Sequence, residues 1–371
     1  MTPQPAKIYL DLAARAAYRA AGDAEPNPLV GCVIVRDGRI IGVGHHKKFG
    51  GLHAEREALA DCLRRGEDPR GAVVYVTLEP CCHFGKQPPC TAALIEAGVA
   101  RVVAAGPDPN PVSGGGAAKL EAAGIPCEFN ASSANALEVG EPFVRRIRTG
   151  LPWVIAKWAQ TVDGRLITRA DEPRWISGEV ARRRVHRWRA RVDAIITGIG
   201  TVLADDPLLT ARGVARVRRL ARRVVVDSHL RLSPLTQVAR TAAQTPTTVV
   251  CLPAAATSVA AGPLTRLGVE IVACEGGERG IVPREVLRLL AERYSVASVM
   301  LECGPRLLAS FFAAGLIDEA IVHIGSARLN EAGARASAER AFAALADRAA
   351  YRLCRARPLG GDTELIHRAH R

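Results

Sequence analysis

The residues with the clearest chemical potential are a histidine, two cysteines and a glutamate in the first quarter of the chain. His53 is followed two positions later by Glu55, and the loop that starts at Pro80 contains Cys81 and Cys90. Imidazole and thiolate groups bind zinc, and three protein ligands leave a fourth position for water. Glu55 adds the proton carrier that hydrolysis at such a metal needs. These residues predict a catalytic zinc site with an adjacent acid/base group.

Two predicted helix starts would bring these ligands together. Positions i and i+2 lie on nearly opposite faces of a regular helix, so His53 and Glu55 can approach one metal only where a helix begins. Gly50 and Gly51 come just before such a start, and the apolar spacing after His53 indicates an amphipathic helix. Cys90 starts a second helical run, where the helix dipole favours a thiolate. Residues 72–78 are typical of a buried strand that ends beside both runs.

The first cysteine ligand has competitors on its own loop. The order His-x-Glu followed by Pro-Cys-x-x-Cys is typical of zinc deaminases, in which the glutamate is not a ligand. In this chain eight residues, not two, separate Cys81 from Cys90. Cys82 and His83 could bind the metal in place of Cys81. We prefer Cys81 because it directly follows Pro80, as the signature requires.

Composition limits the classes of partner. The 371 residues suggest two domains, and no apolar run of about 18 residues or secretory signal is evident. The ten scattered cysteines fit reduced thiols in the cytoplasm. The net charge of +13 invites a nucleic-acid partner, but aromatic residues, at 4%, are too few for stacking on bases. We therefore expect a phosphorylated small substrate, no nucleic acid and no membrane.

Strands and helices alternate in both halves of the chain, which predicts α/β domains. The basic stretch at 143–152 ends in glycine and proline and is the expected boundary between a domain at 1–146 and a domain at 151–371. The second domain should contain a largely parallel sheet. It lacks a Gly-x-Gly-x-x-Gly fingerprint, so a nicotinamide cofactor would be held in another way. We expect a loop at 114–116 and, after Asn330, a tail that could form a terminal helix.

The motifs of both halves resemble those of the bifunctional riboflavin-biosynthesis deaminase/reductase family. In the first half these are Pro26-Asn27-Pro28, His53-Ala54-Glu55, the loop from Pro80 to Cys90, and Asp108-Pro109-Asn110-Pro111. In the second half they are Lys157-x-Ala159, Asp163-Gly164-Arg165, Trp175-Ile176, Gly200-Thr201-Val202, Asp205-Asp206-Pro207, Val226-Asp227-Ser228 and Glu302-x-Gly304-Pro305. The resemblance covers about residues 8–325.

This resemblance implies a fold, two activities and their cofactors. The first domain would be a cytidine-deaminase-like three-layer domain and the second would be dihydrofolate-reductase-like. The first would use zinc to deaminate 2,5-diamino-6-(5-phosphoribosylamino)pyrimidin-4-one. The second would use NADPH to reduce the ribosyl chain of the product to ribityl. The resemblance also implies a homo-oligomer, either a dimer or a tetramer.

The same resemblance implies the residues of each site. Zinc would be bound by His53, Cys81 and Cys90, with Glu55 as the catalytic proton shuttle. The substrate of the second site would contact Arg189, Leu209, Arg212 and Glu302, and the two arginines suit its phosphate. Most other arginines of residues 182–191 are expected to face solvent. NADPH would contact Gln160, Trp175, Thr201, Asp205, Ser228, Gly304, Pro305, Arg306, Leu307, Leu308, Ala309 and Ser310.

The sequence departs from the family pattern at two places. Pro173 stands where relatives often have a hydroxyl contact to substrate, and residues 325–329 differ from the family's stretch after Ala320. Two other functions remain compatible with the motifs. One is a nucleic-acid deaminase with an appended binding domain, which predicts strongly salt-dependent binding to RNA or DNA. The other is a deaminase whose second domain is inactive.

Overall fold

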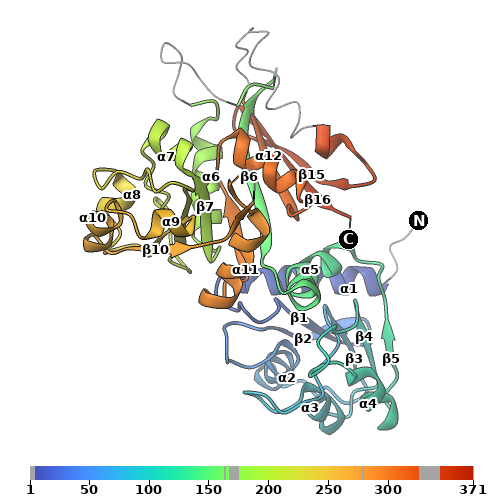
Figure 1. Ribbon diagram of the computed structural model, residues 1–371. Coiled ribbons are helices and arrows are strands. Elements are labelled where there is room, and N and C mark those ends of the chain that lie inside the picture. The colour runs from blue at the N-terminus through green and yellow to red at the C-terminus, as the bar shows by residue number, and fades with distance from the viewer. Residues whose placement is uncertain (1–4, 163, 167–174, 278–279, 326–342, 371) are drawn as a thin grey trace. The chain divides into compact units, whose positions relative to one another are not determined.

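The computed structural model describes residues 5–162, 164–166, 175–277, 280–325 and 343–370 (Figure 1). The chain divides into two compact units, Met1–Gly150 and Leu151–Arg371, each with its own sheet. Pro173, and residues 326–329 of the second departure, lie outside the described residues. Among the described residues, no helix is long and apolar enough to span a bilayer.

The first unit is built on a five-stranded mixed sheet in the order β2-β1-β3-β4-β5. The hairpin β1–β2 and the pair β1–β3 are antiparallel, whereas β3, β4 and β5 run parallel. The parallel strands end at one edge, where the loops that carry the cysteines begin. The strands are β1 Gly31–Arg36, β2 Arg39–His45, β3 Val73–Val76, β4 Arg101–Ala104 and β5 Cys127–Phe129.

Helices cover both faces of this sheet and make three layers (Figure 1). Helices α2, α3 and α4 pack on one face through buried side chains such as Ala58 and Leu94. Helices α1 and α5 cover the other face through Leu10 and Ala136. The three-layer α/β prediction is therefore confirmed. The helices are α1 Pro5–Ala17, α2 Ala54–Arg64, α3 Cys90–Glu96, α4 Gly116–Ala122 and α5 Ala134–Thr149, with a 3-10 turn at Tyr18–Ala20.

A close approach between α2 and β2 fixes the beginning of α2. A Cβ atom on Gly44 would lie 2.2 Å from the backbone nitrogen of Ala58 and 2.3 Å from the carbonyl oxygen of Ala54. Only glycine allows the helix to lie directly on the strand at this position. The first turn of α2, which carries Glu55 and directly follows His53, is thereby held against the sheet.

The second unit has a nine-stranded sheet in the order β10-β9-β8-β7-β13-β6-β14-β16-β15. The strands from β10 to β14 are parallel, and β14, β16 and β15 are antiparallel neighbours. The strands are β6 Trp153–Thr161, β7 Ala194–Gly198, β8 Arg222–Val226, β9 Thr247–Cys251, β10 Val269–Ala273, β13 Ser298–Leu301, β14 Glu319–Gly325, β15 Tyr351–Leu359 and β16 Asp362–Ala369, with a small pair β11 Gly276–Gly277 and β12 Gly280–Ile281.

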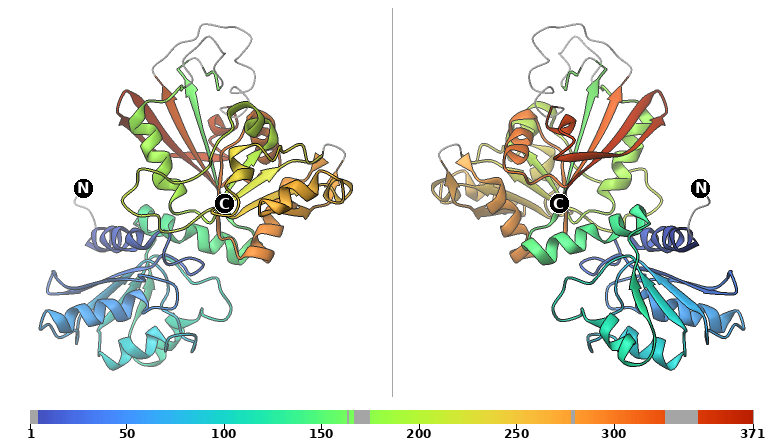
Figure 2. Two further views of the ribbon diagram at one scale, coloured as in Figure 1. Left: turned by 90° about the vertical axis from the view of Figure 1, so that its left-hand side faces the viewer. Right: turned by 90° about the vertical axis from the view of Figure 1, so that its right-hand side faces the viewer.

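Helices again cover both faces of this sheet (Figure 2). Helices α11 and α12 bury Leu287 and Phe311 against one face, and α6, α8 and α10 bury Val185, Val238 and Leu264 against the other. The largely parallel sheet expected from the sequence is thus present. The helices are α6 Glu179–Arg189, α7 Ile199–Asp205, α8 Gln237–Arg240, α9 Pro253–Ala256, α10 Ala261–Arg266, α11 Pro283–Tyr294 and α12 Pro305–Ala313.

Two local predictions were wrong. The tail after Asn330 does not end in a helix, because residues 351–369 form the antiparallel strands β15 and β16, which complete the sheet. The loop expected at 114–116 ends one residue early, because Gly116 already begins α4. A Cβ there would lie 1.8 Å from the carbonyl oxygen of Pro80, so glycine is needed for α4 to pack on the cysteine loop.

Candidate functional site

The structure brings His53, Cys81 and Cys90 together. His53 precedes the first turn of α2, Cys90 is the first residue of α3, and Cys81 follows the end of β3. The His53 Nδ1 atom lies 3.5 Å from Cys81 Sγ and 3.4 Å from Cys90 Sγ, and the three ligand atoms lie within 4.8 Å of one another. A tetrahedral zinc ion with Zn–S of about 2.3 Å and Zn–N of about 2.0 Å requires S···N separations of roughly 3.5 Å. The donor set therefore fits zinc.

The neighbouring cysteine points elsewhere. The Cys82 thiol lies 3.0 Å from the carbonyl oxygen of Gly114, and its backbone N–H donates to the carbonyl of Ser113. His83 lines the adjacent cavity without joining the three-residue cluster. The geometry thus favours Cys81 over Cys82 and His83 as the ligand on this loop.

Glu55 lies in the buried first turn of α2, beside the same cluster. It is 3% exposed, and burial together with the nearby Cys81 charge raises its pKa to about 7. Hydrogen bonds from Cys90 and His53 lower the pKa of the Cys81 thiol to about 4. A carboxyl group with a pKa near neutrality can both accept and release a proton under physiological conditions. Glu55 is suited to proton transfer.

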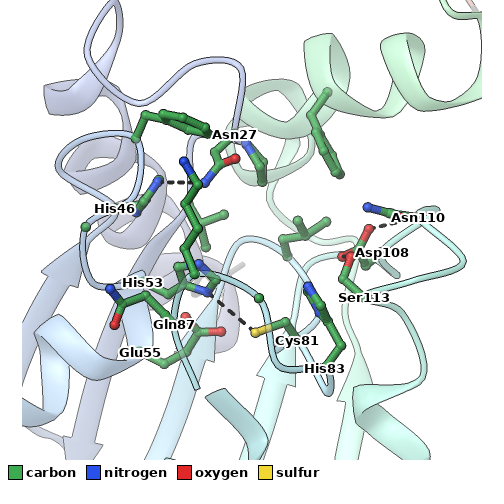
Figure 3. Close-up of a pocket in the computed structure, with 18 of the residues that line it drawn as sticks. Asn27, His46, His53, Glu55, Cys81, His83, Gln87, Asp108, Asn110 and Ser113 are labelled. Carbon is green, nitrogen blue, oxygen red and sulfur yellow. Dashed lines mark hydrogen bonds between the residues drawn. The ribbon is translucent and has the colours of Figure 1, made fainter. Parts of the chain in front are cut away.

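His53, Glu55 and Cys81 lie at the floor of a cavity of about 250 Å³ within the first unit (Figure 3). On one wall the Asn27 amide lies 3.2 Å from His46 Nε2, while His46 Nδ1 lies 2.9 Å from the carbonyl oxygen of Leu52. The His46 ring meets the His53 ring edge to face at 5.3 Å between centroids. His46 therefore braces the histidine ligand and also presents a polar surface to the cavity.

The opposite wall is formed by the loop after β4. The Ser113 hydroxyl donates to Asp108 at 2.6 Å, and the Asn110 backbone N–H donates to the same carboxylate at 2.9 Å. Glu79, at the end of β3, accepts from the backbone N–H groups of Asp108 and Ala117, and so ties this loop to α4. The Asp-Pro-Asn-Pro motif indicated this loop, but His46, Glu79 and Ser113 carried no signal in sequence alone.

In the second unit, the predicted substrate residues Arg189 and Glu302 form one ion pair. The Arg189 guanidinium donates two bonds to the Glu302 carboxylate, at 2.6 and 2.8 Å, and both side chains are 13% exposed. Its remaining nitrogen donates to the carbonyl oxygen of Thr210 at 3.2 Å. The fork of Arg189 is occupied, so of the two arginines expected at the phosphate, Arg212, which is exposed, is the one available.

Lys157 lies close to this pair and was assigned no role from the sequence. It sits on β6, and burial lowers its pKa while the nearby Glu302 charge opposes that shift. A lysine between the apolar residues 153–156 and Trp158 of the strand was the available signal. The remaining substrate residue, Leu209, is 3% exposed and has a positive φ of 51°.

Most of the predicted cofactor residues follow the carboxyl ends of parallel strands. Thr201 lies on α7 after β7, Ser228 follows β8, and Gly304 is the N-cap residue of α12, after β13. The Gly304 N–H donates to Thr201 Oγ1 at 3.0 Å, which joins two of these segments. Gly304, the N-cap residue of α12, has no side chain that could cap the helix, so the backbone N–H groups of the first turn suit a phosphate of a dinucleotide. Residues 304–310, the N-cap and N-terminal part of α12, therefore fit NADPH.

The other predicted cofactor residues lie outside the segments that follow β7, β8 and β13. Gln160 is buried on β6 and accepts from Trp158 Nε1 at 2.9 Å. Trp175 is 58% exposed, with the Arg182 guanidinium 5.2 Å from its ring centroid. Asp205 is the exposed last residue of α7. Of the arginines expected to face solvent, Arg183 is exposed, whereas Arg184 is partly buried and pairs with Glu364 at 3.5 Å.

Comparisons with known proteins match both units. Residues 4–106 match the cytidine and deoxycytidylate deaminase zinc-binding region, and residues 152–357 match the RibD C-terminal domain. The chain is 37% identical over 326 residues to riboflavin biosynthesis protein RibD of Aquifex aeolicus, covering 88% of each chain. It is 36% identical over 342 residues to the Escherichia coli protein of that name, covering 86% of this chain and 87% of the relative.

Two solved structures agree over the length of the chain. The diaminohydroxyphosphoribosylaminopyrimidine deaminase/5-amino-6-(5-phosphoribosylamino)uracil reductase of Thermotoga maritima is 30% identical, with a TM-score of 0.81 and 99% of both chains covered. A RibD structure from Acinetobacter baumannii is 33% identical, with a TM-score of 0.77 and the same coverage.

Proposed function

This chain belongs to the RibD family of riboflavin-biosynthesis proteins, and from this premise we infer the roles of its residues. The chain is a bifunctional enzyme, a zinc-dependent deaminase joined to an NADPH-dependent reductase. The match of the second unit to the RibD C-terminal domain argues against a nucleic-acid deaminase with an appended binding domain. The observation that carries the assignment is the His53, Cys81 and Cys90 cluster with buried Glu55 beside it.

For the first site, we propose that His53, Cys81 and Cys90 hold zinc and that Glu55 moves the protons. A bound zinc ion supplies Lewis-acid activation of the attacking water. The Glu55 carboxylate takes one proton of that water and delivers it to the ring nitrogen. It then takes the second proton from the oxygen newly bonded to carbon and delivers it to the amino group, which leaves as ammonia. One C–O bond forms and one C–N bond breaks at the carbon that carries the amine. The substrate is 2,5-diamino-6-(5-phosphoribosylamino)pyrimidin-4-one.

For the second site, we propose reduction of the ribosyl chain of the deaminated product to ribityl. NADPH, when bound, would supply the hydride to sugar carbon C1′, while the C1′–O bond of the ribose ring opens and its oxygen takes a proton from solvent. The Thr201, Ser228 and Gly304–Ser310 segments would hold the cofactor, with Gln160, Trp175 and Asp205 completing its surroundings. Glu302 and Arg189 would orient the sugar as a fixed pair, Leu209 would pack on the substrate, and the Arg212 guanidinium would bind the phosphate.

Three broader features belong to this proposal. The functional domains span 1–146 and 151–371, and both act in the cytoplasm, where the free cysteines of the described chain would stay reduced. The protein works as a homo-oligomer, a dimer or a tetramer. Its partners are phosphorylated pyrimidines, without nucleic acid or membrane.

The test is mass spectrometry of the diaminopyrimidine phosphate after incubation with the protein. Without NADPH, the proposal expects only the deaminated pyrimidine, and with NADPH the ribityl product. Glu55→Gln protein should form neither from the diamino substrate but should reduce supplied deaminated substrate. Loss of both activities in a folded Glu55→Gln protein would contradict the division of labour between the sites.

A further inference from the structure

The loop between Leu209 and Arg212 is fastened to α6 through backbone groups. The Thr210 carbonyl oxygen lies 3.2 Å from Arg189 Nη1 and 3.1 Å from His186 Nδ1. The Arg212 backbone N–H donates to the same His186 nitrogen at 3.2 Å. A single ring nitrogen of one histidine thus faces both a carbonyl acceptor and an N–H donor.

These two contacts require different states of the His186 ring. A nitrogen that carries a proton can donate to Thr210, whereas only an unprotonated nitrogen can accept from Arg212. The Thr210 carbonyl already receives a hydrogen bond from Arg189. Among the described residues, His186 Nδ1 is the acceptor found for the Arg212 N–H. The contact that His186 alone can supply is therefore the hydrogen bond that its Nδ1 accepts from the Arg212 backbone N–H. This bond requires the neutral ring with its proton on Nε2.

We propose that His186 is a positioning residue of the reductase site, which holds the backbone of Arg212 so that its guanidinium meets the substrate phosphate. This inference rests on the proposed role of Arg212 as the phosphate-binding residue. The loop needs such a hold, because Arg212 is exposed and Leu209 adopts a left-handed backbone conformation. His186 lies three residues before Arg189 on α6, so the two side chains that bond to this loop lie on the same face of the helix.

The electrostatic surroundings favour the neutral ring. Burial lowers the pKa of His186, and the charges of Arg189 on α6 and of Arg212 on the loop lower it further. The Thr210 carbonyl and the Glu302 carboxylate, which follows β13, act in the opposite direction. The net shift is downward, so the ring is mostly an acceptor at neutral pH.

The test compares two substitutions of nearly equal shape in the full-length holoenzyme. His186→Leu removes the ring nitrogen, whereas His186→Asn keeps a polar group at about the position of Nδ1. The KM for the deaminated substrate should rise about tenfold in the leucine variant, the value expected for one lost hydrogen bond. It should return to within about threefold of the wild type in the asparagine variant. NADPH affinity and deaminase turnover should stay unchanged in both, and Arg183→Leu, at an exposed position of α6, is the matched control.

Acidification gives a second readout. The wild-type KM should rise as pH falls through the pKa of His186, because the protonated ring no longer accepts from Arg212. The substrate phosphate also titrates near pH 6. In the asparagine variant the KM should change with pH only through this phosphate, so any additional change in the wild-type KM comes from His186. An unchanged KM in His186→Leu, or equal defects in the folded leucine and asparagine variants, would overturn the inference. If Arg212→Lys also left the KM unchanged, the proposed phosphate site itself would be wrong.

Discussion

Substitution of Glu55 by glutamine separates proton transfer from every other property of the first site. Glutamine has nearly the same size and remains polar, but it cannot carry a proton. Because general acid–base catalysis contributes roughly 10²- to 10⁴-fold, deaminase turnover should fall by at least two orders of magnitude. Zinc content should stay the same, because Glu55 is not among the three clustered ligand residues.

The same substitution should stabilise the metal-free protein at alkaline pH. Burial raises the pKa of Glu55 from 4.5 to about 7, so ionisation of the folded protein is unfavourable. At about 1.4 kcal/mol per pK unit, the cost is roughly 3 kcal/mol. This cost is absent below pH 4.5, grows between pH 4.5 and 7, and is fully present above 7. At pH 8, metal-free Glu55→Gln protein should therefore unfold at a higher denaturant concentration than the wild type. At pH 4 the two proteins should unfold at the same denaturant concentration.

The assay combines ammonia release, zinc analysis and denaturant unfolding after chelation. Glu57→Gln is the matched control, because Glu57 lies two positions further along α2 and pairs with Lys47 instead of facing the cluster. Near-normal ammonia release by Glu55→Gln would refute the proton-transfer role. A loss of zinc equal to the loss of activity would instead make Glu55 a ligand.

Four further predictions address other parts of the molecule. Cys90→Ser and Cys81→Ser should each lower zinc from about one ion per chain to near zero, whereas Cys82→Ser should keep it. Zinc retained in Cys81→Ser but lost in Cys82→Ser, by elemental analysis, would move the ligand to Cys82. Arg212→Lys should weaken substrate binding about tenfold or more, because lysine cannot form the guanidinium fork. NADPH binding, titrated separately, should be unchanged. An equal loss of substrate binding in Arg183→Lys would show that diffuse charge, and not Arg212, binds the phosphate. Burial raises the pKa of Glu364, but the hydrogen bond from His323 and the charges of Arg184 and Arg357 bring it down to about 2. The stability that Glu364 contributes is therefore present above about pH 4.5 and is lost as pH falls toward 2. Glu364→Gln should flatten that acid limb in denaturant unfolding, and an unchanged pH profile would contradict the network. Arg223→Met should raise the reductase KM, because Arg223 is fully buried and donates to the Leu208 carbonyl next to Leu209; wild-type kinetics in the folded variant would exclude that contact as important.

The chemistry of the first site was accessible from the sequence because its ligands stand at element boundaries. The positions of His53 and Cys90 at helix starts follow from local spacing, and the structure has both there. The preference for Cys81 over Cys82 required the loop geometry, in which Gly114 draws the Cys82 thiol away. His46 was not identified, because its place beside His53 depends on the pairing of β1 with β2 and on no local pattern.

The C-terminal strands were missed for a different physical reason. Residues 351–359 are rich in arginine, and the strand they form at the edge of the sheet buries Tyr351 alone of its residues, so apolar alternation is weak. Their conformation is set by pairing with β16, and β16 in turn pairs with β14. Such long-range pairing leaves little trace in a local window. The Arg189–Glu302 pair was likewise anticipated only as two separate contacts, because the two residues lie 113 positions apart.

The most direct test of two activities in one chain is the order of products formed from the diaminopyrimidine phosphate. Wild-type protein is incubated first without and then with NADPH, and the products are followed by mass spectrometry. The deaminated pyrimidine should accumulate first, with release of ammonia, and should gain two hydrogens only after NADPH is added. Reduction of the diamino substrate before deamination, or no reduction of the deaminated product, would contradict this prediction.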